Sequence, residues 1–278
     1  METESQTESQ TKIESELPVF ISFSNYGYVK MAENLLRNMK DRVKHHKMVM
    51  YCLDKETYEH LLPWEETDKI ELIIYDKFNT SKEFERYDSD KFKEIDHLHI
   101  SILKHAFEKY DFIHFLDSDT VVLNEPSKEY YEDYKEYDIV FQQDGNCIEP
   151  DFAAWTCIGN MSLRNRPNTH FLLDVMNIYK QGYIGIGFNY NDQEILRKIF
   201  QRVNVTDIRN YPHTKLSQYP SIHYTCGVLV TQDKVDISQI KIFHANWVVG
   251  FSSKIDLLKK VGAWYIPPDS TDISNNNH

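Results

Sequence analysis

The chain has few basic residues for its length. Among its 278 residues, 31 are Lys or Arg and 43 are Asp or Glu, which gives a formal net charge of -12. Nucleic acids attract basic surfaces, so this balance argues against a nucleic-acid partner. It does not exclude a phosphorylated small ligand, because a bound divalent cation reverses the local charge.

Long apolar runs and paired cysteines are also missing. No apolar stretch reaches membrane-spanning length, and none follows a basic start, so the sequence predicts neither a membrane span nor a secretion signal. The four cysteines, Cys52, Cys147, Cys157 and Cys226, do not have the spacing of a metal site. We interpret them as reduced thiols and predict a cytosolic location.

The glycine-rich turn of dinucleotide-binding enzymes is not found either. The first strand-like run is followed by Asn25-Tyr26-Gly27-Tyr28, whereas a dinucleotide site needs Gly-x-Gly-x-x-Gly at that place. This argues against an NAD-dependent dehydrogenase.

The remaining pattern predicts one α/β domain between two polar tails. Residues 1–17 are acid-rich and predicted to be disordered, residues 18–268 to form the domain, and residues 269–278 to be a frayed tail. Apolar runs predict strands over Val19–Phe23, Met48–Leu53, Ile70–Tyr75, Phe112–Leu116, Ile139–Gln142, Val228–Thr231 and Ile240–Phe243. Helical periodicity predicts helices over Met31–Met39, Glu56–Leu62, Leu98–Tyr110, Thr169–Tyr179 and Asp192–Phe200. This alternation favours a Rossmann-like, mostly parallel sheet with helices on both faces.

Two aspartates follow the strand predicted over Phe112–Leu116. In an open parallel sheet, ligands bind beyond the carboxyl ends of the strands, where Asp117 and Asp119 fall. Extended backbone directs these two carboxylates to one side and Ser118 to the other. Hard oxygen ligands suit Mn²⁺ or Mg²⁺, and phosphate oxygens can fill the remaining coordination positions. The motif therefore predicts a cation that assists a diphosphate leaving group.

A phosphatase is the alternative for the same residues. Asp117 would be the nucleophile and Asp119 the general acid. That motif usually follows the first strand of its domain, but here three predicted strands come first. It also needs a later pair of aspartates after a strand, which is not evident. A simple turn at a strand end is the third interpretation.

Four motifs occur in a defined order along the chain. They are Ser22-Phe23-Ser24-Asn25 with Tyr28, then Asp117-Ser118-Asp119, then Asn191-Asp192-Gln193-Glu194, and last His244-Ala245-Asn246 with Gly250 and Lys254. Together they resemble the GT-A nucleotide-diphospho-sugar transferases, which include glycogenin-like enzymes and plant cell-wall xylosyl- and arabinosyltransferases. The resemblance extends from about Pro18 to Trp264 and implies the GT-A fold.

The resemblance implies a set of metal and phosphate ligands. His244 would be the third protein ligand beside Asp117 and Asp119, and an imidazole ligand favours Mn²⁺ over Mg²⁺. Gly250 would let the backbone approach the diphosphate, and Lys254 would neutralise it.

The resemblance also implies a binding site for the rest of the donor. Its predicted contacts are Ser22, Ser24, Asn25, Tyr28, Asp54, Lys104, Ser118 and Gln193. For Ser24 and Asn25 the alternative role is to cap a helix, and for Lys104 it is plain solvation.

The catalytic candidates are two further carboxylates. In similar enzymes the aspartate of Asp192-Gln193 lies beside the reacting face of the sugar, and Asp144 resembles the aspartate that contacts the donor sugar or the acceptor. Asp192 has another interpretation, because Asn191 and Glu194 are typical of a capping box at the start of a helix. A carboxylate there is stabilised as an anion, which suits a group facing positive charge.

One segment departs from the family pattern. Many relatives have Asn-(Thr/Ser)-Gly where this chain has Trp155-Thr156-Cys157-Ile158-Gly159-Asn160, so sugar identity and acceptor orientation stay open. Trp155 and Trp247 either stack on a sugar ring or lie in the core.

The sequence thus predicts transfer of a sugar from a UDP-sugar to a glycan or other hydroxyl acceptor, with Mn²⁺ or Mg²⁺. Xylose is the first guess for the sugar, and retention or inversion at the anomeric carbon is open. A non-catalytic sugar-binding module, which would bind UDP without a metal, is a further alternative.

Overall fold

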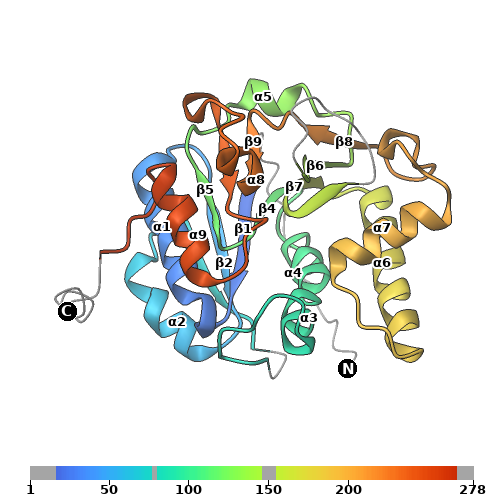
Figure 1. The fold of residues 1–278 in the computed structure, drawn as a ribbon, viewed down its shortest axis with the longest axis horizontal. Helices are drawn as coiled ribbons and strands as arrows, with labels where there is room; N and C mark the ends of the chain where they lie inside the picture. Colours follow the sequence, from blue (N-terminus) through green and yellow to red (C-terminus); the bar gives the residue numbers. More distant parts are fainter. Residues whose placement is uncertain (1–16, 77–79, 146–154, 268–278) are drawn as a thin grey trace, which may run out of the picture.

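A central sheet of seven strands organises the protein. The structure is a computed structural model that describes residues 17–76, 80–145 and 155–267, so the predicted tails lie outside the described residues apart from Leu17 (Figure 1). The sheet has the order β3-β2-β1-β4-β7-β6-β8. Its strands are β1 (Val19–Ser24), β2 (Met48–Cys52), β3 (Ile70–Ile74), β4 (Phe112–Leu116), β6 (Ile139–Gln143), β7 (Thr156–Arg164) and β8 (Leu216–Tyr219).

The sheet is mostly parallel, as predicted. Strands β1 to β4 run in one direction, and β6 and β8 are parallel to each other. Strand β7 is the exception, because it is antiparallel to both of its neighbours, β4 and β6. The carboxyl ends of β1, β4 and β6 therefore meet at the edge of the sheet where β7 begins.

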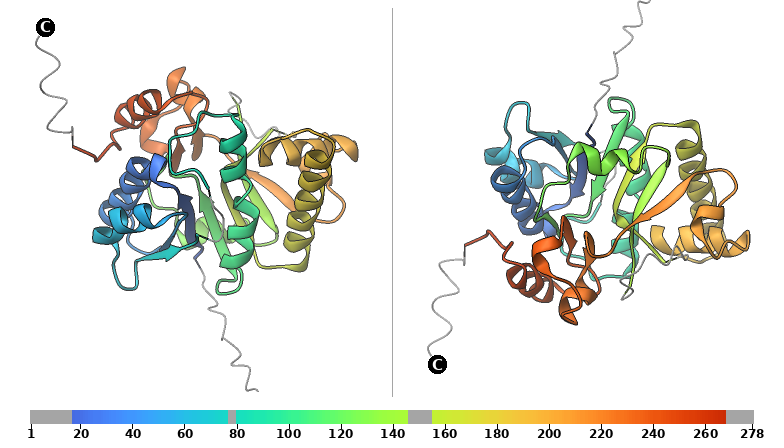
Figure 2. Two further views of the ribbon diagram at one scale, coloured as in Figure 1. Left: turned by 90° about the horizontal axis from the view of Figure 1, so that it is seen from below. Right: turned by 90° about the horizontal axis from the view of Figure 1, so that it is seen from above.

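Helices cover both faces, which confirms the predicted layers (Figures 1 and 2). Adjacent side chains of β1 point to opposite faces of the sheet, because Phe20 packs in one apolar cluster and Ile21 in the other. The Phe20 side holds α1 (Val29–Arg42), α2 (Lys55–Leu61) and α5 (Lys128–Glu132). The Ile21 side holds α3 (Asp90–Asp96), α4 (His99–Ala106), α6 (Pro167–Gly185) and α7 (Asp192–Arg202). Within the described ranges, none of the helices has the length and apolar character needed to cross a membrane.

A second, smaller sheet lies beside the first. Its strands are β5 (Thr120–Val122), β10 (Ile242–His244) and β9 (Tyr224–Cys226), with β10 in the middle, antiparallel to β5 and parallel to β9. Helices α8 (Gly227–Thr231) and α9 (Phe251–Lys260) follow in the same part of the chain. The described residues also form four short 3-10 helices: η1 (Tyr26–Tyr28), η2 (Leu62–Trp64), η3 (Ile208–Asn210) and η4 (Ile237–Gln239).

The predicted strand over Val228–Thr231 is wrong, because these residues form α8. A short apolar run fits a buried strand or a buried helical turn equally well. The strand comes just before it, as β9. Gly227 begins α8 directly after β9, and a Cβ there would lie 2.1 Å from the carbonyl oxygen of Asn246.

Asn38 of α1 joins the smaller sheet to the helical layer. The side chain is fully buried, its Nδ2 donates to the carbonyl of Val122 at 2.9 Å, and its Oδ1 accepts from the Val122 amide at 2.7 Å. The amide thus pairs with β5 on the side away from β10, as another strand would. This contact fixes β5, which directly follows Asp119.

Replacing Asn38 with Ala should therefore destabilise the fold. Two buried backbone groups would lose their partners, at a cost of about 2–4 kcal/mol in the free energy of unfolding. Lys40→Ala, an exposed change on the same helix, should cost less than about 0.5 kcal/mol. Urea unfolding measures both, and equal midpoints for the two variants would contradict this role of Asn38.

Candidate active site

Three predicted metal ligands meet where the two sheets join. Asp117 follows β4, Asp119 precedes β5, and His244 ends β10. Because β10 pairs with β5, His244 lies opposite Thr120. The His244 Nε2 atom is 3.3 Å from Asp117 Oδ2 and 3.2 Å from Asp119 Oδ1. One ligand atom from each residue lies within 4.8 Å of the others, so the structure brings together the residues that were predicted to hold a cation.

Gly159 of β7 makes room for this cluster. A Cβ at this position would lie 2.0 Å from Asp117 Oδ2 and 2.7 Å from His244 Cε1. The carbonyl of Gly159 also accepts from the Asp117 amide at 2.7 Å. Only glycine lets β7 pass so close to the two ligands. Gly159 belongs to the segment that departs from the family pattern, but its contact with the metal ligands could not be predicted from the sequence.

The charges of the cluster are balanced by His244 and Lys254. Burial opposes ionisation of Asp119, but the charges of Lys254 and His244 outweigh it and hold the pKa of Asp119 well below its usual value. Burial likewise disfavours the imidazolium, yet Asp119 keeps the pKa of His244 well above its usual range. The Lys254 ammonium forms an ion pair with Asp119. Two acids and two bases thus share one small, largely buried site.

Cys157 contacts the ring nitrogen of His244 that does not face the carboxylates. Its Sγ lies 3.4 Å from His244 Nδ1, and the Asn246 amide points to the same sulfur at 3.7 Å. The imidazole is therefore held with its Nε2 toward the carboxylates. Cys157 lies within the segment that departs from the family pattern, and no motif indicated that it touches a ligand.

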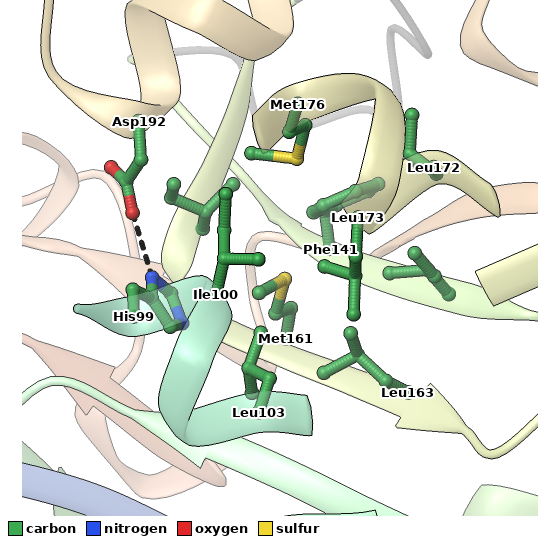
Figure 3. Close-up of a pocket in the computed structure, with 12 residues that line it drawn as sticks. His99, Ile100, Leu103, Phe141, Met161, Leu163, Leu172, Leu173, Met176 and Asp192 are labelled. Carbon is green, nitrogen blue, oxygen red and sulfur yellow. Dashed lines mark hydrogen bonds and ion pairs between the residues drawn. The ribbon is translucent and has the colours of Figure 1, made fainter. Parts of the chain in front are cut away.

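Asp192 starts α7 and lies in a buried network. Asn191 and Glu194 form the predicted capping box, with the Glu194 amide donating to Asn191 Oδ1 at 2.8 Å. The Asp192 carboxylate is 2.7 Å from His99 Nδ1 of α4, and both residues line one side of the apolar pocket drawn in Figure 3. The Asp192 amide donates to Asp96 of α3 at 2.8 Å. Sequence reasoning missed Asp96 and His99, because their roles come from partners about 95 residues away.

This network shifts the proton affinity of its members. Burial raises the pKa of Asp192 to about 7, and the charge of Asp117 adds to the shift. Burial and Asp192 also raise the pKa of Asp96 well above its usual value. Burial lowers the pKa of His99 to about 4, so its ring is neutral at pH 7. Asp192 can therefore change its charge near neutral pH.

Asp144 collects three donors at the end of β6. Its carboxylate accepts from Gln193 Nε2 at 2.8 Å, from the Trp247 indole Nε1 at 2.6 Å and from Asn246 Nδ2 at 3.4 Å. Asp144 thus links the start of α7 with the loop after His244. The predicted catalytic candidates Asp144 and Asp192 are brought to the same first turn of α7, through Gln193.

The predicted nucleobase contacts mainly hold the segment 81–85. Asn25 Nδ2 donates to the carbonyls of Ser81 at 2.7 Å and Glu83 at 3.1 Å, and the Tyr28 hydroxyl donates to the carbonyl of Glu85. Burial raises the pKa of Tyr28, and the next cause is the charge of Asp119, so Tyr28 also lies within electrostatic reach of the cluster.

Polar capacity remains at this end of β1. The Oγ of Ser22 and the Oδ1 of Asn25 are buried and have no hydrogen-bond partner among the described residues. The Ser24 hydroxyl donates to the carbonyl of Asn25 at 3.0 Å. Ser22 and Asn25 thus have acceptors available for a ligand.

Two predicted donor contacts are engaged in other structural roles. Asp54 caps α2, since its Oδ1 accepts from the Thr57 amide at 2.8 Å and its Oδ2 from the Tyr26 amide at 2.9 Å. Lys104 of α4 forms an ion pair with Asp174 of α6. Neither residue contacts the acidic cluster in the described part of the chain.

The last predicted positions lie around α9. Gly250 precedes this helix with φ 95°, a left-handed backbone conformation that glycine adopts readily. No atom lies within 4 Å of the position that a Cβ would take there. Lys254 follows in the first turn, where it reaches Asp119. Ser118, between the two acidic ligands, is partly exposed.

The family assignment comes from the sequence pattern. The pattern of the nucleotide-diphospho-sugar transferases matches residues 43–258, which contain Asp117, Asp119 and His244. The chain belongs to this family. The match favours a transferase over the phosphatase alternative. No curated protein is similar enough in sequence to be matched with this transferase.

Solved glycosyltransferases have the same fold. GlyE of Streptococcus pneumoniae TIGR4 is 12% identical with a TM-score of 0.57, over 88% of this transferase and 60% of the GlyE chain. The galactosyltransferase LgtC is 10% identical with a TM-score of 0.54, over 90% of this transferase and 97% of LgtC. Mouse xyloside xylosyltransferase 1 is 12% identical with a TM-score of 0.50, over 84% and 99% of the two chains. This chain spans less than two thirds of the GlyE chain. The three structural similarities confirm that it has the predicted GT-A fold.

The raised pKa of Asp192 predicts how stability varies with pH. Between its unfolded value near 4 and the folded value of about 7, the folded transferase binds the extra proton, so this contribution to stability is full below pH 4 and is lost as the pH rises through 7. Asp192→Asn cannot titrate. Its free energy of unfolding relative to the natural protein should rise with pH, by at most about 1.4 kcal/mol per pH unit. Urea unfolding at pH 4.5 to 8 measures this difference, and a constant difference would contradict it.

Proposed function

We propose that this transferase is a metal-dependent glycosyltransferase that moves a sugar from a UDP-sugar to a hydroxyl group of a glycan or small acceptor. The observation that carries the proposal is the convergence of Asp117, Asp119 and His244, whose ligand atoms lie within 4.8 Å of one another. Membership of the nucleotide-diphospho-sugar transferase family supplies the donor class.

The three residues fit a divalent cation. They offer two carboxylate oxygens and one imidazole nitrogen, a donor set that suits Mn²⁺ and, less well, Mg²⁺. Gly159 leaves space for these side chains where a Cβ would displace Asp117. A bound cation would neutralise the charge that grows on the diphosphate as the sugar bond breaks.

Lys254 and the start of α9 are the proposed diphosphate contacts. The Lys254 ammonium already lies at the cluster through its ion pair with Asp119. No side chain stands at Gly250, directly before the helix, and the first amide groups of a helix bind anions well. Ser22, Asn25 and Tyr28, at the carboxyl end of β1, are the proposed contacts of the nucleoside.

Asp192 is the proposed catalytic carboxylate. The contact with His99 fixes its orientation in a buried setting, which strengthens its interaction with positive charge on the sugar. Asp144 is held by three hydrogen-bond donors and is the second candidate for the catalytic carboxylate. Either one would accept the acceptor proton, which accompanies inversion, or stabilise the sugar centre, which accompanies retention.

Xylose remains the first donor sugar to test. The mouse neighbour is named a xylosyltransferase and LgtC a galactosyltransferase, so donor sugars differ within this fold. The cytosolic location and the single-domain boundaries stay predictions.

A donor screen tests the proposal. Release of UDP or GDP from a panel of nucleotide sugars should require Mn²⁺ and stop when a chelator is added. Asp119→Asn should lower the rate by about 100-fold or more, because a ligand and a buried charge are lost together. The control is Asp256→Asn, an exposed change on α9, which should keep the natural rate. Turnover that persists with a chelator would refute metal dependence.

Gly159→Ala tests the cluster without removing a ligand. The added methyl group would displace the Asp117 carboxylate, so the affinity for Mn²⁺ should fall by about tenfold or more. The control is Gly182→Ala on α6, where no atom lies within 4 Å of the new methyl group. Titration calorimetry with Mn²⁺ measures both variants. Equal affinities would contradict the proposed metal site.

A further inference from the structure

Two tryptophans are exposed beside the candidate active site. Trp247 is 54% exposed and Trp155 is 50% exposed. A tryptophan usually buries most of its large apolar surface, so two exposed tryptophans that both contact Asp144 need an explanation. The sequence left a core position and a sugar contact open for both, and the structure removes the core position.

Trp247 is held in an unfavourable backbone conformation. Its φ is 62°, in the left-handed region that bulky residues rarely adopt. Its indole Nε1 donates to Asp144 Oδ1 at 2.6 Å, which fixes the orientation of the ring. The residue thus combines backbone strain, a fixed ring and an open face. Packing in the core does not account for this combination, because more than half of the side chain is exposed.

The fixed ring lies beside the candidate catalytic groups. The carboxylate that binds Trp247 also binds Gln193, the residue next to Asp192. Trp247 lies in the loop that follows β10 and is three residues after His244, the last residue of that strand. A molecule resting on Trp247 is therefore next to both the proposed cation site and the proposed catalytic carboxylate.

Trp155 contacts Asp144 through the backbone. The carbonyl of Trp155 accepts from the Asp144 amide at 3.1 Å and from Gln218 Nε2 at 2.9 Å. Its ring lies 4.9 Å from the guanidinium of Arg197 on α7. Trp155 thus helps to hold Asp144 in place through the backbone, and its own exposed ring lies against Arg197.

We propose that Trp247, supported by Trp155, is the platform on which a sugar ring of the acceptor stacks. This inference rests on the proposed function and names its acceptor class, a glycoside rather than a protein side chain. The C–H face of a pyranose is apolar and its hydroxyl groups lie at the rim. An indole face with amide and carboxylate groups beside it matches both features. The acceptor hydroxyl would then lie next to Asp144 and Gln193.

The test begins with the choice of acceptor. With the donor found in the screen, transfer is measured to p-nitrophenyl glycosides of xylose, glucose and galactose. Peptides containing serine, threonine or hydroxyproline are measured in parallel. The platform predicts that at least one glycoside is a better acceptor than every peptide. Preference for a peptide would overturn the inference.

Two substitutions then test Trp247 itself. Trp247→Gly removes the ring and suits the positive φ, so its Tm should not fall. Its KM for the glycoside should rise about tenfold or more, which is about 1.4 kcal/mol of stacking, while its KM for the donor changes less than about threefold. Trp247→Phe keeps a ring without the N–H donor, so its KM for the glycoside should lie between those of the natural protein and Trp247→Gly. An unchanged acceptor KM, or a lower Tm with equal loss of donor and acceptor binding, would overturn the platform.

A binding measurement separates this inference from the proposed function. Saturation-transfer NMR with methyl β-xyloside, methyl β-glucoside and methyl β-galactoside needs no turnover. At least one glycoside should show saturation of its C–H protons, and that signal should be lost in Trp247→Gly. Failure of every donor in the screen, with this signal intact, would refute the transferase activity but not the platform. Donor turnover with no Trp247-dependent signal would refute the platform alone.

Discussion

The site depends on the pairing of β10 with β5. Asp119 directly precedes β5, and His244 is the last residue of β10, so the register of this one antiparallel pair decides whether the imidazole meets the carboxylates. The Ala245 amide, which donates to the carbonyl of Asp119 at 3.2 Å, extends the pairing to the ligands themselves. A slip of one residue would turn His244 to the other face of the small sheet. Asn38 protects this register, because its side-chain amide binds the free edge of β5 at Val122.

Charge balance follows from that geometry. A carboxylate as buried as Asp119 is stable only with a compensating partner, and here it has two, His244 and Lys254. The protein carries a net charge of -12, which repels a donor with a negative diphosphate. The positive charges of His244 and Lys254 therefore have a specific role in the proposed function. It offsets the acidic surroundings where the diphosphate would bind.

The sequence predicted most elements of the fold because their apolar residues follow a regular period. It missed β7, in which the polar residues Asn160 and Ser162 are buried among apolar ones, and it mistook α8 for a strand. It also missed the shorter elements β5, β8, β9, α3 and α5 and the helix α9. The metal ligands were predicted from a strand-end motif and a family resemblance. The residues that hold them were not predicted, because Gly159 and Cys157 act through contacts with residues 42 and 87 positions away. Such contacts leave no local pattern.

The first turn of α7 joins the two halves of the proposed reaction. Adjacent residues of this turn face different partners: Asp192 binds His99 of α4, and Gln193 binds Asp144 at the end of β6. The α4 contact orients the proposed catalytic carboxylate, whereas Asp144 orients the ring of Trp247. Because both contacts leave from one rigid helical turn, the carboxylate and the proposed acceptor platform cannot move independently. A capping box fixes where that turn starts, and thereby sets the distance between the group that would act on the sugar and the surface that would receive it.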